Sequence, residues 1–248
     1  MGERNHLCIE LLRARKFDQL DQILQTAQQN FEKGSFSETQ LTKLFGNFCS
    51  VDESLLPLLD DYLAKFPSSY ASHLALGIYY VEYGWSKRGY DFAEKLNGEQ
   101  IYGFMEFLGH ANVHLTRSVE LTKTPILSLV QLMIIAMGIG EQDQGDKRKF
   151  YQAALDCYPP CLGIRKQYLR TLRPQWGGSL VEMDAFTADP QHNILPKHLY
   201  LEFVASKYFI EFHYHLVIDK NIAKALWALL KGGCTKLLAT IVSLFYSS

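Results

Sequence analysis

The chain has 248 residues, of which 48% are apolar, 21% are charged and 13% are aromatic. This balance is that of an ordinary globular protein and excludes an intrinsically disordered chain. The formal net charge is -1, so no global electrostatic field favours nucleic acid or anionic lipid as a partner.

The first part of the chain, residues 1–66, is expected to form N-terminal helices. Over 7–27, apolar residues recur at spacings of three and four, which is the pattern of amphipathic helices. Ser37 and Gln40 have the spacing of a capping box at the start of another helix. A further helix is predicted over 52–66, where the helical spacing continues and a proline follows directly.

Residues 67–188 are interpreted as a repeat-like core of paired helices. The motif Leu76-Gly77-x-x-Tyr80 suits such pairs, because glycine lets a neighbouring helix approach and tyrosine fills the gap beyond it. Pro125 and Pro159 each follow a predicted helix and are 34 residues apart, which is the tetratricopeptide period. The spacing within 85–100 does not fit a regular array. The sequence therefore predicts an all-α fold, a degenerate tetratricopeptide-like helical repeat that forms either an α-α superhelix or an irregular stack of helix pairs.

The repeat pattern is interrupted at 172–179, where the sequence reads Leu-Arg-Pro-Gln-Trp-Gly-Gly-Ser. Proline and two consecutive glycines predict a structured turn, and Ser179 is the expected N-cap of the next helix. That helix is predicted over 180–187. After a loop at 189–195, a long helix is predicted over 196–217.

The C-terminal helices are assigned to 189–248, and the whole chain 1–248 is interpreted as a single helical domain. The segment 222–246 is apolar and about as long as a membrane span, but it contains three lysines and a Gly-Gly break. Each ammonium group at mid-membrane depth costs roughly 2.5–3.5 kcal/mol. Two short core or capping helices are therefore predicted there, with membrane attachment through Leu237–Tyr246 as the alternative.

Cysteine usage indicates the compartment. The five cysteines are widely scattered and odd in number, which argues against a disulfide framework. The first ten residues carry charges and lack an apolar run, so no secretory signal is expected. A cytoplasmic location is the resulting prediction.

Several motifs occur in a fixed order along the chain: Phe66-Pro67-Ser68-Ser69-Tyr70, then Trp85-x-x-Arg88-Gly89, a helix around Ala111, and Tyr168-Leu169-x-x-Leu172-x-Pro174-x-Trp176-Gly177-Gly178-Ser179 followed by Met183. Together they resemble an uncharacterised bacterial domain-of-unknown-function family, related to tetratricopeptide and Sel1-like helical repeat proteins. The resemblance extends over about 11–186, and the Trp-Gly-Gly-Ser turn is its most specific element. It implies a helical, mostly Gram-negative bacterial protein without an established activity. It also implies a further helix pair near the C-terminus, from which the apolar end of this chain departs.

The most site-like feature of the sequence combines an arginine, two tryptophans and the glycine turn. Arginine beside tryptophan provides a cation–π pair and a planar fork for a carboxylate, and the glycines are expected to expose backbone N–H groups. Such a set would bind a peptide carboxylate or a phosphate. In the alternative interpretation, the tryptophans fill helix–helix joints and the glycines serve only the turn. The candidate partner-binding residues are Trp85, Arg88, Trp176, Gly177, Gly178, Tyr80 and Arg173.

A second candidate site lies on the helix around Ala111. Glu106, His110 and His114 are spaced i, i+4 and i+8, so they share one helical face and are suitable ligand types for a metal ion. No other motif supplies the remaining ligand, and an exposed or structural role is the alternative.

Motifs of enzymes are missing from the sequence. It contains no nucleophile elbow, P-loop or dinucleotide-binding glycine motif, so neither an enzyme nor a cofactor is predicted. The expected function is a protein–protein interaction scaffold that binds a partner peptide or helix in a groove between helices. Two alternatives stay open: a metal-binding protein or enzyme that uses the face of Glu106, and a helical protein attached peripherally to a membrane.

Overall fold

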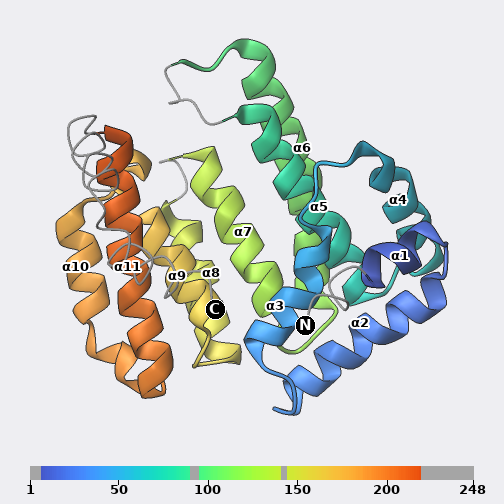
Figure 1. The fold of residues 1–248 in the computed structure, drawn as a ribbon, viewed down its shortest axis with the longest axis horizontal. Coiled ribbons are helices and arrows are strands. Elements are labelled where there is room, and N and C mark those ends of the chain that lie inside the picture. The colour runs from blue at the N-terminus through green and yellow to red at the C-terminus, as the bar shows by residue number, and fades with distance from the viewer. Residues whose placement is uncertain (1–6, 90–94, 141–143, 219–248) are drawn as a thin grey trace, which may run out of the picture. The chain divides into compact units, whose positions relative to one another are not determined.

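The computed structural model describes residues 7–89, 95–140 and 144–218, which belong to two compact units, 1–196 and 197–248. Over the described residues the chain is helical and contains no strand, which confirms the predicted all-α fold (Figure 1). The described α-helices of the first unit are α1 (Leu7–Arg13), α2 (Phe17–Glu32), α3 (Glu38–Phe45), α4 (Leu56–Lys65), α5 (Tyr70–Arg88), α6 (Gly98–Glu120), α7 (Ile126–Ile139), α8 (Gln144–Cys157), α9 (Leu162–Thr171) and α10 (Leu180–Ala188). Short 3-10 helices lie between them at η2 (Gly46–Phe48), η3 (Glu53–Leu55), η6 (Pro174–Trp176) and η7 (Pro190–Ile194).

The helical pattern at the start of the chain is divided between two helices. Arg15 separates α1 from α2, because its backbone adopts a left-handed conformation with a φ of 54°. The N–H of Lys16 then donates to the carbonyl of Leu11 at 2.9 Å, which satisfies a carbonyl at the end of α1. Arginine rarely adopts this conformation, so the periodicity of apolar residues did not indicate the break.

The predicted N-caps are confirmed. At the start of α3, Ser37 Oγ accepts the N–H of Gln40 at 3.2 Å, and Gln40 Oε1 accepts the N–H of Ser37 at 2.9 Å. This reciprocal pair is a capping box. At the start of α10, Ser179 Oγ accepts the N–H of Glu182 at 3.2 Å.

Helices α5 and α6 form an antiparallel pair (Figure 1). A Cβ added to Gly77 of α5 would lie 2.6 Å from Cγ of Leu115 on α6. One added to Gly84, two turns later in α5, would lie 3.2 Å from Cβ of Phe107, earlier in α6. The prediction that Gly77 admits a neighbouring helix is confirmed, since any side chain there would displace Leu115.

Helix α7 lies in the core of the first unit, where it contacts α5, α6, α8 and α9. The sequence of α7 is almost wholly apolar, as expected of a helix surrounded by others. Gly138 lets this helix approach α6, because a Cβ there would lie 2.7 Å from the ring of Phe104. The buried side chains of α7 include Ile126, Leu129, Leu132, Met133, Ile135 and Ala136.

The second unit is described only through α11 (Lys197–Ile218), which matches the long helix predicted over 196–217. The two short helices predicted within 222–246, including Leu237–Tyr246, lie outside the described residues. Among the helices that the structure describes, none combines the length and the apolar character needed to cross a membrane.

Candidate functional site

The fold brings the end of α5 to the glycine turn. The guanidinium carbon of Arg88 lies 5.5 Å from the ring centroid of Trp85, 5.7 Å from that of Trp176 and 6.0 Å from that of Phe104. The two tryptophan rings meet edge to face, with their centroids 5.7 Å apart. We call Trp85, Arg88, Phe104 and Trp176 the arginine–aromatic cluster. The cluster unites three residues that the sequence singled out and adds Phe104, which belongs to α6 and carries no motif.

The side chains of the arginine–aromatic cluster pack against one another and against the backbone of the same chain. The half-buried guanidinium of Arg88 is stacked among three rings, and its Nη1 donates to the carbonyl of Gly89 at 3.3 Å. Burial lowers the pKa of Arg88 from its ordinary value. The indole N–H of Trp85 is buried without a hydrogen-bond partner among the described residues. These contacts fasten η6 onto α5 and α6, which is the role of a joint between elements.

The glycine turn does not expose the backbone N–H groups that its sequence suggested. The N–H groups of Trp176 and Gly178 both donate to the carbonyl of Arg173, at 2.9 and 3.2 Å. The N–H of Gly177 donates to the carbonyl of Pro174 at 3.2 Å. Donors that are used within the turn cannot also bind a phosphate or a carboxylate. The expectation that the glycines expose their N–H groups is therefore wrong, and Arg173 serves the turn through its carbonyl oxygen.

Both glycines are required by the shape of the turn. Gly177 has a φ of 84°, in the left-handed region. A Cβ added to Gly178 would lie 2.2 Å from the carbonyl oxygen of Leu172. Glycine avoids both the strain and the clash. The structure thus supports the alternative interpretation, in which these glycines serve the turn itself.

Tyr80 belongs to a different set of rings. It faces α6, where it stacks on Phe107, His110 and His114 with ring centroids 6.1, 5.3 and 5.9 Å away. Glu106 lies one turn before His110 and is exposed. In the part of the chain that the structure describes, no group of three or more His, Cys, Asp or Glu side chains is placed to hold a metal ion. The metal site predicted from Glu106, His110 and His114 is therefore not formed among the described residues.

His114 forms a hydrogen-bonded pair with His73 of α5. Their Nδ1 atoms are 3.3 Å apart, and Nε2 of His73 lies 3.0 Å from the carbonyl oxygen of Pro67. A carbonyl only accepts, so Nε2 of His73 carries a proton, and a neutral His73 accepts at Nδ1 from His114. Burial, with the nearby His73 and His110, lowers the pKa of His114 to about 4. The pair is therefore neutral near pH 7.

A buried polar network, which no sequence motif indicated, joins α9 to η7. Arg165 is 1% exposed; its Nε donates to Nδ1 of His192 at 3.1 Å, and its Nη1 donates to the carbonyls of Pro159 and Cys161 at 2.7 and 2.9 Å. His192 in turn donates from Nε2 to the carbonyl of Phe186 at 2.8 Å. Hydrogen bonds of this kind offset the cost of burying a guanidinium. The network is internal and holds the chain after α10 against α9.

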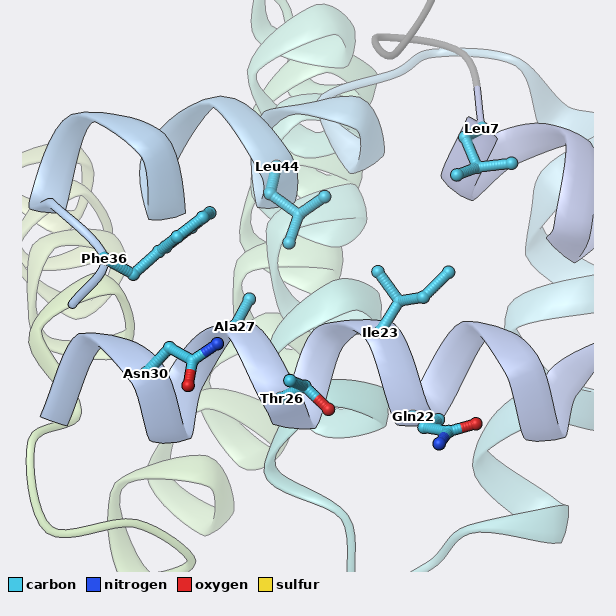
Figure 2. A pocket seen from close by; sticks show the side chains of 8 residues that line it. All are labelled: Leu7, Gln22, Ile23, Thr26, Ala27, Asn30, Phe36 and Leu44. Atoms are coloured by element: carbon cyan, nitrogen blue, oxygen red, sulfur yellow. The ribbon is translucent and has the colours of Figure 1, made fainter. Parts of the chain in front are cut away.

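An open groove lies between α2 and α3, with the start of α1 at one end (Figure 2). Its volume is about 480 Å³. Figure 2 shows Ile23 and Ala27 projecting from α2 toward Leu44 of α3, with Phe36 beside α3 and Leu7 across the opening. None of the lining residues is charged. The lining consists of Leu7, Gln22, Ile23, Thr26, Ala27, Asn30, Phe36 and Leu44.

The groove exists because α2 has more apolar surface than its core contacts use. Leu20, Leu24 and Phe31 are buried on the core side of the helix. Ile23 occupies the neighbouring stripe and is only half-buried, next to the exposed Thr26. The sequence predicts the amphipathic helix, but the stripe left uncovered depends on where α3 lies.

A second hollow, of about 310 Å³, lies between the α4–α5 connection and α2 and is more polar. Its polar groups bind one another. Asp21 accepts the hydroxyls of Tyr62 and Ser69 at 2.7 and 2.5 Å, and Ser69 accepts the side-chain amide of Gln25 at 3.0 Å. The side chains of Asp21, Gln25 and Ser69 are therefore engaged within the chain.

Comparison with known proteins places the groove within a defined family region. Residues 6–143 match the family described as Domain of unknown function (DUF4034). The chain belongs to the DUF4034 family. The matched region contains α1 to α7, and with them the groove, Trp85, Arg88 and Phe104. It ends before the Trp-Gly-Gly-Ser turn, so the turn is not part of the family match. No curated protein and no solved structure matches the chain.

Proposed function

We propose that the protein is a protein–protein interaction scaffold that binds an uncharged, apolar segment of a partner in the groove between α2 and α3. The observation that carries this proposal is the lining of the groove, in which Leu7, Ile23, Phe36 and Leu44 present apolar surface without a charged neighbour in the lining. A groove of this size and composition suits a few anchor side chains on one face of a helix or peptide.

The uncharged lining also restricts the partner. A charged anchor would lose its hydration in the groove without meeting an opposite charge from the lining, which is costly. The amides of Gln22 and Asn30 at the rim are able to hydrogen-bond a partner backbone. We therefore expect apolar anchors flanked by polar positions, and binding that depends little on salt.

The proposal is tested by selecting peptides from a displayed library against the whole chain and measuring their affinities by calorimetry. Thr26→Trp places a bulky ring at the mouth of the groove from an exposed position, and we expect it to weaken binding at least tenfold, or about 1.4 kcal/mol. Lys33→Ala, at the C-terminal end of the same helix and outside the lining, is the matched control. Equal binding to wild type and Thr26→Trp would count against the groove.

A second comparison separates the groove from the arginine–aromatic cluster. Arg88→Met changes the joint between α5 and η6 but leaves the groove lining intact, so the folded variant should keep its affinity for the selected peptides. Loss of affinity in folded Arg88→Met with full affinity in Thr26→Trp would move the binding site to the cluster. No selected peptide at all would contradict the scaffold proposal.

We further propose that the helix pairs α5–α6, α7–α8 and α9–α10 are diverged tetratricopeptide-like units, with the Trp-Gly-Gly-Ser turn inside the last pair. A proline lies in the connection before the first helix of each pair: Pro67, Pro125 and Pro159. The first helices of successive pairs also contact one another, α5 with α7 and α7 with α9. Such stacking is typical of helical repeats.

We also propose a cytoplasmic location. The four cysteines among the described residues, Cys8, Cys49, Cys157 and Cys161, are free thiols. Free thiols suit a reducing compartment. Fractionation of the native host is the direct test, and recovery of the protein from the periplasm would contradict it.

A further inference from the structure

Helix α6 carries an uncharged stripe on the side that faces solvent. Five residues of α6 lie along one line of the helix, because they are spaced by three, four, three and four positions. These are Tyr102, Met105, Gly109, Asn112 and Thr116. Tyr102 is 70% exposed, Met105 is 43% exposed, and Val113 beside this line is 65% exposed. We call these residues the α6 stripe. The α6 stripe consists of Tyr102, Met105, Gly109, Asn112, Val113 and Thr116.

The α6 stripe is separate from the face that α6 uses in the core. Phe104, Leu108, Ala111 and Leu115 are buried on the other side of the helix. A helix that packs on one face only is expected to be polar on its solvent side. The α6 stripe instead combines three exposed apolar side chains with small uncharged residues over four turns, which is typical of a surface that contacts another molecule.

We propose that the α6 stripe binds the α6 stripe of a second copy of this chain, with the two α6 helices antiparallel and crossing at Gly109. The first basis is size. Tyr102 and Met105 are bulky and lie toward the start of α6, whereas Asn112 and Thr116 are smaller and lie toward its end. A twofold axis at Gly109 sets Tyr102 level with Thr116 of the second copy, so large residues meet small ones.

Gly109 suits the crossing point. Its position is exposed, and a Cβ added there would meet no atom within 4 Å. Two helices that cross at glycine are able to approach to about 8 Å between their axes. Met105 then lies level with Val113 of the second copy, on either side of the crossing.

Charge is the second basis. Glu99 flanks the start of the α6 stripe and Arg117 flanks its end. The antiparallel arrangement brings Glu99 near Arg117 of the second copy. Arg117 already pairs with Glu120 of its own chain at 2.5 Å, and its fork of N–H donors is able to serve a second carboxylate. A parallel arrangement would instead set Glu99 level with Glu99 and Tyr102 level with Tyr102. Complementary charge and size therefore favour the antiparallel pair.

The polar members of the α6 stripe fit the same direction. Thr116 lies level with Tyr102 of the second copy, and their hydroxyl groups are able to hydrogen-bond each other. Asn112 lies level with Glu106 of the second copy, so an amide that donates is placed near a carboxylate that accepts. In a parallel pair, Glu106 would lie level with Glu106. The antiparallel contact between the two α6 stripes thus gives Asn112 and Thr116 hydrogen-bond partners, which a purely apolar contact would not provide.

The length of the α6 stripe indicates the size of the dimer interface. The α6 stripe extends over about 21 Å of helix at 1.5 Å per residue, which gives an interface at the small end of the specific range. We therefore expect a dimer that forms and dissociates with concentration. This inference does not depend on the groove between α2 and α3, because no α6 residue lines that groove.

The first measurement is the mass of the whole chain by sedimentation over about a hundredfold range of concentration, reaching about 200 µM. The expected mass rises from 28.4 kDa toward twice that value. Val113→Glu puts a charge into the dimer interface from an exposed position, near Glu106 of the second copy, and should lower the dimer fraction at least fivefold. Lys43→Glu on α3, also exposed, should leave the dimer fraction unchanged.

The sign of an introduced charge tests the direction of the helices. Val113→Lys is matched to Val113→Glu in position and exposure, but its ammonium group would lie near the carboxylate of Glu106 in the antiparallel pair. We expect Val113→Lys to retain at least three times the dimer fraction of Val113→Glu. An equal decrease of the dimer fraction in Val113→Lys and Val113→Glu would contradict the antiparallel arrangement.

Disulfide formation under mild oxidation tests the geometry. Gly109→Cys should cross-link to itself rapidly, because the axis sets the two introduced thiols face to face. Thr116→Cys alone should not, since the two positions would be about 21 Å apart along the helices. A mixture of Tyr102→Cys and Thr116→Cys chains should cross-link to each other. The wild type, with its exposed Cys49, gives the background rate.

Two further outcomes overturn the proposal. A mass that stays at the monomer value over the whole range shows that the α6 stripe binds no second copy, whether it is bare or covered by another part of the chain. Rapid self-linking of Thr116→Cys, with Gly109→Cys at the background rate, shows an interface with a different geometry.

Discussion

The carboxylate of Glu38, in the first turn of α3, accepts the backbone N–H of Gly163, in the first turn of α9, at 2.6 Å. The same carboxylate accepts the N–H of Leu162 at 2.9 Å, and the thiol of Cys161 donates to it at 3.6 Å. Cys161 occupies the N-cap position of α9, but its side chain makes no capping hydrogen bond. Glu38 therefore caps the N-terminus of α9 instead. The interaction joins two helices that are more than a hundred residues apart in the sequence.

Replacing Glu38 should therefore destabilise the first unit. Glu38→Ala leaves two N–H groups at the start of α9 without an acceptor, and we expect it to lower the free energy of unfolding by about 1–3 kcal/mol. Thr39→Ala, at the next and exposed position of α3, should change it by less than about 0.5 kcal/mol. Urea unfolding followed by circular dichroism measures both. Equal effects of the two substitutions would show that the cap contributes nothing to stability.

The arginine–aromatic cluster should show coupling between its members. In a double-mutant cycle of Arg88→Met and Trp176→Leu, we expect a coupling energy of about 0.5–2 kcal/mol, because the planar cation loses its stacking in either variant. Lys87→Met, at the exposed neighbouring position, should show no coupling to Trp176→Leu. Thermal or urea unfolding provides the free energies. Additive effects of Arg88→Met and Trp176→Leu would contradict the assignment of the cluster as a joint.

A side chain at Gly178 should strongly destabilise the glycine turn, and a side chain at Gly177 should destabilise it less. Gly178→Ala forces the backbone of Leu172 to move, and we expect a loss of about 2–4 kcal/mol or more. Gly177→Ala places a side chain in a left-handed conformation at a cost of about 1 kcal/mol. Gly46→Ala, where the φ is -58° and an added Cβ meets nothing within 4 Å, is the control and should be close to neutral. A larger loss for Gly46→Ala than for Gly178→Ala would be incompatible with this turn.

Stability should fall in mild acid through His114. The unfolded chain protonates this histidine near its ordinary pKa of 6.5, whereas in the folded chain burial, with His73 and His110 nearby, lowers its pKa to about 4. The unfolded state therefore binds more protons between these values. The contribution of His114 is complete above pH 6.5 and is lost as the pH falls toward 4. His73 acts in the same direction, since burial and the charge of Arg117 lower its pKa also.

The measurement is the free energy of unfolding at pH 7 and pH 5 for wild type and His114→Gln. Because His114 is only half-buried and solvent screens its charge, we expect the wild type to lose about 1–2 kcal/mol more than the variant over this interval. His198→Gln, at an exposed position of α11, should follow the wild type. Identical pH dependence in wild type and His114→Gln would rule out a lowered pKa for His114.

The sequence by itself determined the elements of the fold that depend on local chemistry. Helical spacing of apolar residues predicted the all-α fold, and the Ser37 and Ser179 caps formed as expected because capping needs only neighbouring residues. Gly77 was also interpreted correctly, since a glycine within an apolar helix indicates close approach of another helix. The same reasoning grouped Trp85, Arg88 and Trp176, although it did not indicate Phe104.

The tertiary structure alone decided how each surface is used. The N–H groups of Gly177 and Gly178 are used within their own turn. His114 stacks on Tyr80 and pairs with His73, because the path of the chain places these partners beside it. The cap from Glu38 to Gly163, the groove beside Ile23 and the exposed α6 stripe all depend on where helices distant in sequence lie. Local spacing fixes which face of a helix is apolar, but only packing determines whether that face is buried, lines a groove or stays exposed.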